Sequence, residues 1–503
     1  MHPTLKRAAL AALVLVGVAG PLAASAPGLE MGVGDLAPAR DQERPNVLIL
    51  FADDMGYGDV GFTGSTQVKT PNLDALARDG IVFPQAYVTA PVCAPSRAGL
   101  LTGRYQQRFG FETNPAGGEQ LKAEVIGMQV REKALGDRMR ACGYDTACIG
   151  KWHLGQDDRF YPTNRGFDYF FGMRGGGHRY IVSLNPTTPG WYPTFTLERM
   201  GEKLDRIEVP YLTDWFTEDA MNYLDRRAKA DDGKPWFLYL SYNCPHGPLE
   251  AKESDIARYP HVEPKGRRTY CAMLDCLDQN VGRLIAKLKA NGQYDDTVIL
   301  FLNDNGGSVE TVHALNAPFW GTKGTFYEGG IRVPMFVHAP ARFAPGTYAH
   351  PVISLDIMPT IVALGGGTLE PETYKKGKRD VPVIYDGVNL LPYLNGEVGD
   401  TRPHDKLYWR MMSRGSAMRD GDWKLIFTPH DPPQLFDLAE DPAERNNLAA
   451  ANPDIVARMM DEHNQWCDTF ERAPMWLGDP YWYAFSRKNH RKDFQLTQPE
   501  VTR

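Results

Sequence analysis

The chain has 503 residues, with 55 Lys and Arg against 62 Asp and Glu, which gives a formal net charge of −7. This acidic balance argues against a general nucleic-acid binder, which needs excess positive charge to bind phosphates. A hydrophobic share of 43% and a charged share of 23% exclude a disordered chain, a collagen-like repeat and a polytopic membrane protein. The length corresponds to about three average domains, but large α/β enzymes are often longer than average, so we expect two folded units.

The amino terminus has the features of a secretory signal. Lys6 and Arg7 precede an apolar run over residues 8–20 that is too short to span a bilayer, and small residues follow at 23–26. We therefore expect a cleaved signal peptide at 1–26, a linker at 27–44, and export to the periplasm or the medium with no membrane attachment after cleavage. The alternatives are an uncleaved anchor or a buried helix.

Seven cysteines in an exported chain are an odd number, so at least one does not form an intrachain disulfide. Two pairs, Cys142 with Cys148 and Cys271 with Cys276, are close enough in sequence to bond, but spacing alone does not establish a disulfide. Buried free thiols are the favoured interpretation. Cys93 differs from the others in its neighbours, which are described below.

Four segments share one pattern, in which a short apolar run ends in reactive side chains. They are 47–51 followed by Asp53 and Asp54, 146–149 followed by Lys151 and His153, 236–242 followed by His246, and 298–302 followed by Asp304 and Asn305. Repeated short apolar runs followed by helical patterns are typical of an α/β fold with a parallel sheet. Because ligands bind at the carboxyl ends of the strands in such sheets, we expect these side chains to meet in one site.

Between and after these strands, the chain has one clear helix and two irregular stretches. A stripe of apolar residues at helical spacing predicts a core helix over 270–290, closed by Asn291 and Gly292. Residues 172–210 and 365–386 lack periodicity, and the first is expected to be a long loop over the crevice. After about residue 400, short runs separated by turns predict a small antiparallel sheet and a final helix over 453–470. We therefore predict an α/β catalytic domain at 45–399, with a central, mostly parallel sheet flanked by helices, and a small α+β subdomain at 400–503.

The acidic strand ends indicate a metal site. Asp53, Asp54, Asp304 and Asn305 offer hard oxygen ligands, which suit calcium or magnesium better than zinc because no His or Cys set at zinc spacing accompanies them. Either pair alone would more often be a helix cap or a turn former. Both pairs together with nearby cations favour a site.

Cys93 lies at the start of a second motif, Cys-Ala-Pro-Ser-Arg. Pro95 suits the first turn of a helix, which places Cys93 at the positive helix end, and Arg97 can reach back to it. The motif alone could be coincidence. Its companions make coincidence implausible; they are Gly-Lys-Trp-His at 150–153, Pro-His at 245–246, Gly-Thr-Lys at 321–323 and Glu-Gly-Gly at 328–330.

With these motifs the chain resembles the type I sulfatases, the formylglycine-dependent members of the alkaline-phosphatase-like superfamily. The resemblance rests on PNVLILFADDMGYGD from Pro45, CAPSRAGLLTGR, GKWHLG, PHGP, NDNGG, GTKGTFYEGGIRVP, and GDWKL followed by LFDLAEDPAERNNLA. It covers nearly the whole mature chain, and none of the core motifs departs from the family pattern. It implies an alkaline-phosphatase-like fold and a sulfuric ester hydrolase.

In that family a maturation enzyme oxidises the motif cysteine to formylglycine, so the resemblance makes Cys93 the precursor of the nucleophile. It implies that the hydrated aldehyde attacks sulfur, and that one divalent ion, calcium with magnesium as the alternative, is held by Asp53, Asp54, converted Cys93, Asp304 and Asn305. The remaining implied roles are charge neutralisation by Lys151 and Lys323, orientation of the nucleophile by Arg97, protonation of the leaving alcohol by His246, and removal of the second hydroxyl proton by His153.

The substrate is less well defined by sequence. Export and family resemblance favour sulfated carbohydrates, such as algal polysaccharides or glycosaminoglycans. Five loop residues are candidates for substrate contact, although such residues often only shape a site; they are Arg174, His178, Arg179, His313 and Trp320. Aromatic residues from Trp476 to Phe485 and the cations that follow could line a sugar subsite, but packing and surface roles are favoured for them.

Two other functions are alternatives. A phosphonate or phosphate monoester hydrolase of the same superfamily would use a similar tetrahedral anion. A non-catalytic binder of sulfated glycans would result if Cys93 stayed a thiol.

Overall fold

The computed structural model describes residues 44–115, 126–182, 196–411, 414–428 and 431–470, all within one unit spanning Met31–Arg503. The expected signal peptide, nearly all of the linker and the aromatic segment from Trp476 to Phe485 lie outside the described residues. Within the described part of the chain, no helix combines the length and the apolar character needed to cross a membrane.

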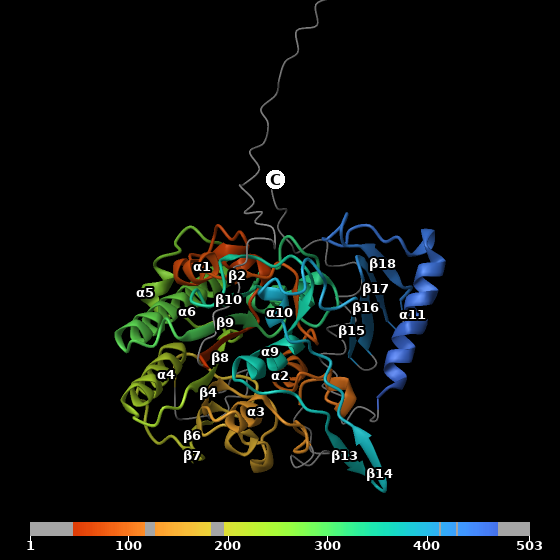
Figure 1. The fold of residues 1–503 in the computed structure, drawn as a ribbon. Helices are drawn as coiled ribbons and strands as arrows, with labels where there is room; N and C mark the ends of the chain where they lie inside the picture. The colour runs from red at the N-terminus through yellow and green to blue at the C-terminus, as the bar shows by residue number, and fades with distance from the viewer. Residues whose placement is uncertain (1–43, 116–125, 183–195, 412–413, 429–430, 471–503) are drawn as a thin grey trace, which may run out of the picture. The chain divides into compact units, whose positions relative to one another are not determined.

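A ten-stranded mixed sheet forms the centre of the fold (Figure 1). Its spatial order is β11 (Gly346–Thr347), β2 (Ile81–Val82), β10 (Met335–His338), β9 (Thr297–Asn303), β1 (Asn46–Asp53), β8 (Trp236–Pro245), β4 (Asp145–Lys151), β5 (Tyr169–Met173), β6 (Leu197–Arg199) and β7 (Glu202–Lys203). The five strands from β9 to β5 are parallel, whereas β10, β6 and β7 each pair antiparallel with their neighbours. This confirms the predicted central, mostly parallel sheet.

The central strands are buried along their whole length because helices cover both faces of the sheet. Every residue of β1, β8 and β9 is buried. On one face the core includes residues of α1 (Pro71–Arg78), α4 (Leu212–Lys229) and α6 (Lys265–Ala290). The other face packs against α2 (Cys93–Thr102), α3 (Leu135–Ala141) and α9 (Ile357–Leu364), so the fold has three layers.

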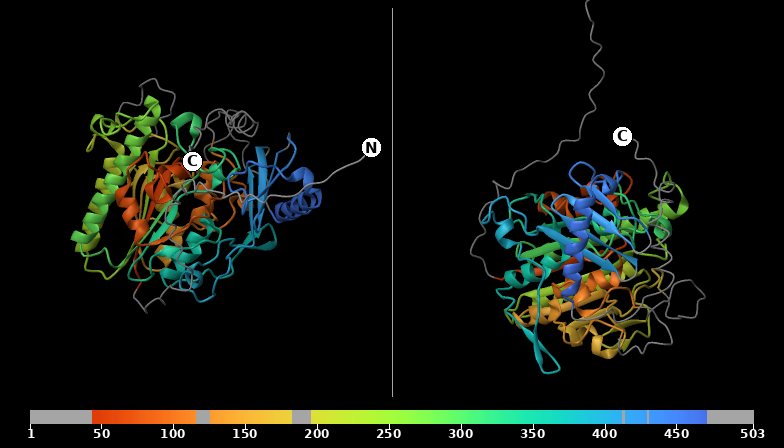
Figure 2. Two further views of the ribbon diagram at one scale, coloured as in Figure 1. Left: turned by 90° about the horizontal axis from the view of Figure 1, so that it is seen from above. Right: turned by 90° about the vertical axis from the view of Figure 1, so that its right-hand side faces the viewer.

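The carboxyl-terminal residues form a second, antiparallel sheet. It consists of β15 (Lys406–Met411), β16 (Gly415–Asp420), β17 (Trp423–Phe427) and β18 (Gln434–Asp437), joined in chain order. Helix α11 (Pro453–Asp468) crosses one face of this sheet (Figure 2), burying Met459 and Trp466. The predicted antiparallel sheet and final helix are confirmed.

The remaining elements are short. They are β3 (Ala86–Tyr87) paired with β12 (Val352–Ile353), the hairpin of β13 (Thr373–Lys376) and β14 (Arg379–Pro382), and the helices α5 (Glu253–Ile256), α7 (Val309–Val312), α8 (Glu328–Ile331) and α10 (Leu391–Leu394).

Three sequence expectations differ in detail from the structure. The predicted helix over 270–290 begins five residues earlier, at Lys265, and the sequence did not indicate this because the polar first turn carries no apolar stripe. The irregular stretch 365–386 contains the β13–β14 hairpin. The predicted long loop contains β6 and β7. All seven cysteines lie in the described residues and are free, five of them buried, in agreement with the favoured interpretation.

Candidate active site

The reactive side chains lie at the carboxyl ends of four adjacent strands, in the order β9, β1, β8 and β4. Asp53 ends β1, Asp304 directly follows β9, Lys151 ends β4 and His246 directly follows β8. Because these strands are parallel, their ends meet at one edge of the sheet. The four segments therefore converge as the sequence predicted.

Two residues at this edge adopt left-handed backbone conformations. Asp54 has φ 62° and His153 has φ 60°, which are uncommon for residues other than glycine. Such conformations cost free energy and are found where the surrounding structure holds a side chain in place for function. Asp54 directly follows β1, and His153 comes two residues after the end of β4.

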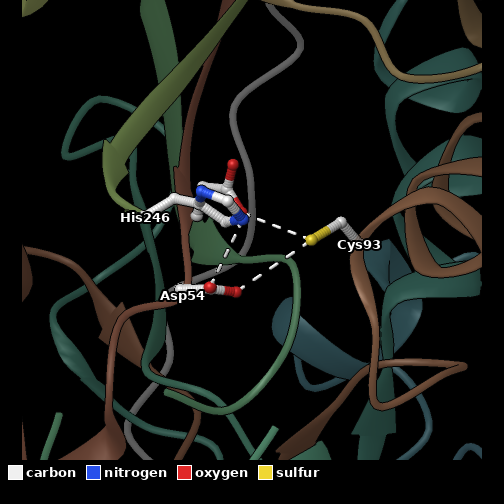
Figure 3. Close-up of side chains that lie close together, drawn as sticks. Asp54, Cys93 and His246 are labelled. Atoms are coloured by element: carbon white, nitrogen blue, oxygen red, sulfur yellow. Dashed lines mark hydrogen bonds and ion pairs between the residues drawn. The ribbon is translucent and has the colours of Figure 1, made fainter. Parts of the chain in front are cut away.

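Cys93 begins α2 and points toward Asp54 and His246 (Figure 3). Its Sγ lies 3.5 Å from Asp53 Oδ1, 4.0 Å from Asp54 Oδ1 and 3.2 Å from Lys323 Nζ. The thiol is 1% exposed, and this burial raises its pKa despite the opposing charges of Lys151 and Lys323. A thiol in this environment stays protonated, so the unmodified side chain is a poor nucleophile.

Three buried carboxylates face three buried cations around Cys93. Lys151 Nζ lies 2.5 Å from Asp53, Lys323 Nζ lies 2.7 Å from Asp54, and Arg97 Nη2 lies 2.8 Å from Asp304. All six side chains are at most 3% exposed, so each charge depends on its partner. The formal charges of this set cancel.

The surroundings shift the pKa values of Asp54 and Asp304 in opposite directions. Burial alone would raise the pKa of Asp54, but Lys323, His246 and Lys151 together lower it to about 2. Burial and the neighbouring Asp53 raise the pKa of Asp304 to about 6, against the charge of Arg97. Asp54 therefore binds a proton less readily than Asp304 does.

Two histidines complete the site. His246 Nδ1 lies 2.7 Å from the Gly247 carbonyl, which assigns the proton to Nδ1 and turns Nε2 toward Asp54 at 3.6 Å. Burial lowers the pKa of His246 to about 3, with Asp54 acting against the shift, and it lowers the pKa of His153 well below its usual value. Among the described residues, none forms a hydrogen bond with His153 Nδ1. Burial thus favours the neutral form of both rings.

The family model named Sulfatase matches residues 45–367, which is more than half of the chain. The chain belongs to the sulfatase family. Mouse arylsulfatase J is 30% identical over 85% of this chain and 76% of its own length, and human arylsulfatase A is 31% identical over 82% and 85%.

Solved structures agree with the family assignment. The crystal structure of Ps i-CgsB in complex with k-i-k-neocarrahexaose has a TM-score of 0.76 and 33% identity, covering 90% of this chain and 99% of that chain. A phosphonate monoester hydrolase from Silicibacter pomeroyi, with a TM-score of 0.58 and 22% identity, shares the fold. The protein is thus a sulfatase, an enzyme that hydrolyses sulfate esters, with the predicted alkaline-phosphatase-like fold.

Members of the sulfatase family use a divalent metal ion and formylglycine, and the site fits such an ion. The ligand atoms of Asp53, Asp54, Cys93 and His246 lie within 4.8 Å of one another. The buried Oδ1 of Asn305 lacks a hydrogen-bond partner in the described part of the chain, while its Nδ2 donates to Asp54 at 2.8 Å. An oxygen held in this way is suited to a metal bond. Asp304 lies outside that four-residue cluster, with Oδ2 held by Arg97.

The five predicted substrate residues have different environments. Arg174 and Arg179 are committed to ion pairs with Glu198 and Glu250. His178 is buried, with Nδ1 2.6 Å from the Arg179 carbonyl. His313 packs against the start of α6, since a Cβ built on Gly266 would lie 2.2 Å from its Nε2.

Trp320 packs, half-buried, against the apolar cluster shared with the carboxyl-terminal sheet. These contacts place both side chains against framework elements, and a substrate-binding role for His313 and Trp320 stays a prediction.

Sequence reasoning missed two residues that hold the site. Ser241 accepts a hydrogen bond from Arg97 Nη1 at 2.6 Å and donates one to the Lys151 carbonyl at 2.8 Å. The sequence signal for Ser241 was the presence of a polar residue inside the largely apolar strand β8. Asn114 Oδ1 accepts the Ala94 N–H at 2.9 Å at the start of α2, and no motif marked it.

Proposed function

We propose that this sulfatase releases sulfate from sulfated carbohydrates. The observation that supports this most directly is the 33% identity over 90% of the chain to a protein whose structure contains a neocarrahexaose. Canine N-acetylgalactosamine-6-sulfatase, which is 30% identical over 85% of this chain, supports a sugar ester as well. Aryl sulfates would then be convenient probes of the same reaction centre.

We further propose that a maturation enzyme converts Cys93 to formylglycine and that calcium, with magnesium as the alternative, binds the oxygen ligands Asp53, Asp54, Asp304 and Asn305 together with the converted residue. Once converted, residue 93 would supply a hydroxyl nucleophile for sulfur, and an ion held by these ligands would supply Lewis-acid chemistry to the sulfate group. The raised pKa of the Cys93 thiol supports this proposal, because the thiol itself has little nucleophilic character.

The lysines bind the sulfate group of the ester. Lys323 is within 3.2 Å of Cys93 Sγ, so its ammonium lies beside the reacting centre, and Lys151 approaches from the neighbouring strand end. Since the three carboxylates and three cations already cancel, a divalent ion leaves the site net positive. This excess charge favours a sulfate ester anion and the further negative charge that develops on its leaving oxygen.

His246 protonates the leaving alcohol, and His153 removes a proton from the hydroxyl group of Cys93 after conversion. His246 Nδ1–H is held by the Gly247 carbonyl, so Nε2 is the atom that carries the transferred proton. An anionic ester beside His246 favours its protonated form, opposing the effect of burial. Arg97 binds Asp304, Ser241 and the Lys151 carbonyl, and thereby fixes α2 and its first residue.

Export and domain division belong to the same proposal. Residues 1–26 would be removed as a signal peptide, 27–44 would be a linker, and the enzyme would act in the periplasm or the medium. Residues 45–399 would form the catalytic domain and 400–503 the carboxyl-terminal subdomain, which agrees with a family match that begins at residue 45.

The decisive experiment has two readouts on protein made in a host able to perform the conversion. The first is the mass of the tryptic peptide Asp79–Arg97, in which we expect formylglycine at position 93. The second is sulfate release from a panel of sulfated oligosaccharides and from 4-nitrophenyl sulfate, with Cys93→Ala as the inactive control. Turnover of the aryl sulfate without release from any sugar would overturn the carbohydrate assignment.

Rates of hydrolysis of matched phosphate and sulfate esters distinguish a sulfatase from the alternative, a phosphonate or phosphate monoester hydrolase. Faster hydrolysis of the phosphate or phosphonate ester would favour a phosphorus-ester hydrolase. An unmodified Cys93 in a competent host would instead favour a sulfated-glycan binder.

Metal binding predicts a measurable stabilisation. Calcium at about 100 times its dissociation constant should raise the free energy of unfolding by about 2.7 kcal/mol relative to protein in a chelator. Thermal unfolding with calcium, with magnesium and with EDTA measures this directly. Equal melting temperatures in all three conditions would contradict the proposed ion site.

A further inference from the structure

A polar cavity lies at the carboxyl end of β5, beside the reaction centre. Its volume is about 280 Å³, and it is lined by Gln156, Arg174, Thr196, Glu198 and Lys203. Drug-sized ligands occupy mostly apolar pockets of roughly 300 Å³ and more. A cavity of this size with only polar and charged lining residues suits one hydroxyl-rich ring better than an apolar ligand.

The cavity shares a wall with the site. Arg174 directly follows β5, and its carbonyl accepts the His153 N–H at 3.0 Å. Gln156 lies three residues after His153 on the loop that leaves β4. Because β4 and β5 are adjacent parallel strands, with Lys151 opposite Met173, Arg174 of the cavity follows the strand next to the one that carries Lys151 of the reaction centre.

Arg174 forms the wall of this cavity. Its Nε and Nη2 each lie 2.9 Å from Glu198, its Nη1 donates to the Gln156 carbonyl at 2.9 Å and lies 2.6 Å from Asp158, and its guanidinium stacks over Tyr161. These contacts occupy most of the five guanidinium donors. Arg174 therefore has little capacity left for a ligand.

Lys203 is the cation that remains available. It is exposed on β7, opposite Glu198 in the antiparallel β6–β7 pair, and Glu198 is already bound by Arg174. Lys203 forms no ion pair with any other residue that the structure describes. An ammonium group with three donors at the edge of a polar cavity is suited to an anionic substituent.

We propose that this cavity binds a sugar residue next to the one that carries the scissile sulfate, and that Lys203 contacts an anionic substituent, such as a second sulfate, on that sugar. The inference rests on the proposed carbohydrate function and adds to it that the substrate is an oligosaccharide with more than one anionic group. Gln156 and Thr196 supply the hydrogen bonds to neutral hydroxyls.

The test is competition against turnover of 4-nitrophenyl sulfate, which is too small to span both positions. The competitors are κ-ι-κ-neocarrahexaose and a chondroitin 6-sulfate tetrasaccharide. We expect at least one to inhibit, and Lys203→Ala to raise its inhibition constant about tenfold while leaving kcat/KM for the aryl sulfate unchanged. Gln156→Ala should weaken inhibition by removing a hydrogen bond to a hydroxyl. Inhibition should still depend on salt concentration in this variant, because Lys203 still contacts the anionic group.

Lys229→Ala is the matched control, because Lys229 is an exposed lysine at the end of α4. It should leave both aryl-sulfate turnover and inhibition unchanged. An unaltered inhibition constant in Lys203→Ala, or the failure of both oligosaccharides to compete, would overturn the cavity proposal. Aryl-sulfate turnover without sulfate release from any sugar would instead contradict the proposed function, so the two failures are distinguishable.

Discussion

Lys323 connects the nucleophile position to the acidic cluster. Its ammonium contacts both Cys93 Sγ and Asp54. Burial lowers the pKa of Lys323, but the neighbouring carboxylates raise it by more, so the charged form is favoured. The side chain comes from a loop that is not part of any strand. Its position therefore depends on the packing of that loop.

We expect Lys323→Ala to lower kcat/KM for an aryl sulfate by about 10²–10³, because it deletes a preorganised charge at the reaction centre. The steady-state rate on 4-nitrophenyl sulfate checks this, with far-UV circular dichroism to verify the fold. Lys378→Ala, in the exposed turn of the β13–β14 hairpin, is the control. Near-normal turnover in Lys323→Ala would remove this residue from the site.

Glu250 holds a loop against both histidines. Its carboxylate accepts the Tyr180 N–H at 2.9 Å and the Ile181 N–H at 3.2 Å, and it binds Arg179 Nε at 2.7 Å. The same loop carries two glycines at 176 and 177, and a Cβ on the first would lie 2.6 Å from His153 Nε2, so only glycine fits this approach. Tyr180 also donates to the His246 carbonyl at 2.8 Å.

Glu250→Ala should therefore lower kcat by about tenfold or more, because small displacements of catalytic groups are costly. KM for an aryl sulfate should change much less, since Glu250 does not reach the sulfate group. Glu208→Ala is the matched control, because Glu208 pairs with Arg199 on the β6 edge. Equal kinetic effects of the two variants would contradict a positioning role for Glu250.

At the scale of elements, a buried charge cluster joins the carboxyl-terminal sheet to the loop that carries the EGG motif. Lys424 of β17 lies 2.7 Å from Glu328 of α8 and 2.7 Å from Glu444, and all three side chains are fully buried. Burial raises the pKa of Glu328, but the charges of Lys424, Arg332 and Arg419 lower it by more, to about 2. For Glu444 burial has the larger effect and raises the pKa to about 7. One lysine thus stabilises two carboxylates.

Lys424→Met should destabilise the protein by about 3–5 kcal/mol, because it leaves buried carboxylates without their cation. Denaturant unfolding measures the change. Lys375→Met removes a lysine from an exposed pair with Asp380 and should change the free energy of unfolding by less than about 1 kcal/mol. Similar losses for both variants would show that the buried cluster has no special role.

The sequence predicted the elements whose pattern is strong. The apolar runs of β1, β4, β8 and β9 are long and are followed by reactive side chains, so the strands were predicted from these runs and the convergence of their ends from the topology of parallel sheets. The strands β2, β7 and β11 have two residues each, which is too short to form a pattern. The strands β13 and β14 are rich in charged residues, so they have no apolar alternation to detect.

The candidate site was predictable only in part, for a related reason. Residues that follow strands could be assigned to one edge from topology. Glu250 and Ser241 act through tertiary contacts with residues that are 71 and 144 positions away, namely Arg179 and Arg97. No local pattern records such a contact. His313 packs against the start of α6, and its contact with substrate stays a prediction.

At the scale of the whole molecule, one histidine couples stability to pH. His404, just before the carboxyl-terminal sheet, lies 2.7 Å from buried Asp356, which follows β12. Burial lowers the pKa of His404, but the charge of Asp356 and its hydrogen bond raise it above the usual value overall. The protonated form is thus favoured by folding.

The pKa of His404 is higher in the folded state than in the unfolded state. The stabilisation by the His404–Asp356 pair is therefore fully present below the unfolded-state pKa of about 6.5 and is lost as the pH rises through the folded-state pKa. His404→Gln should therefore destabilise the protein more at pH 5.5 than at pH 9, relative to the wild type. Melting temperatures of both proteins across this range measure the difference. A constant difference at all pH values would contradict the linkage.

The burial of Cys93 also constrains the order of events during biosynthesis. The thiol is 1% exposed and is enclosed by segments from β1, β8 and the 320–327 loop, which are distant in sequence. An oxidising enzyme needs to hold the residue in its own active site, which this packed arrangement does not allow. The proposed conversion of Cys93 would therefore have to be completed while the chain is still open. Folding and modification would then compete in time, and the specific activity of a preparation would reflect how many chains were oxidised before they closed.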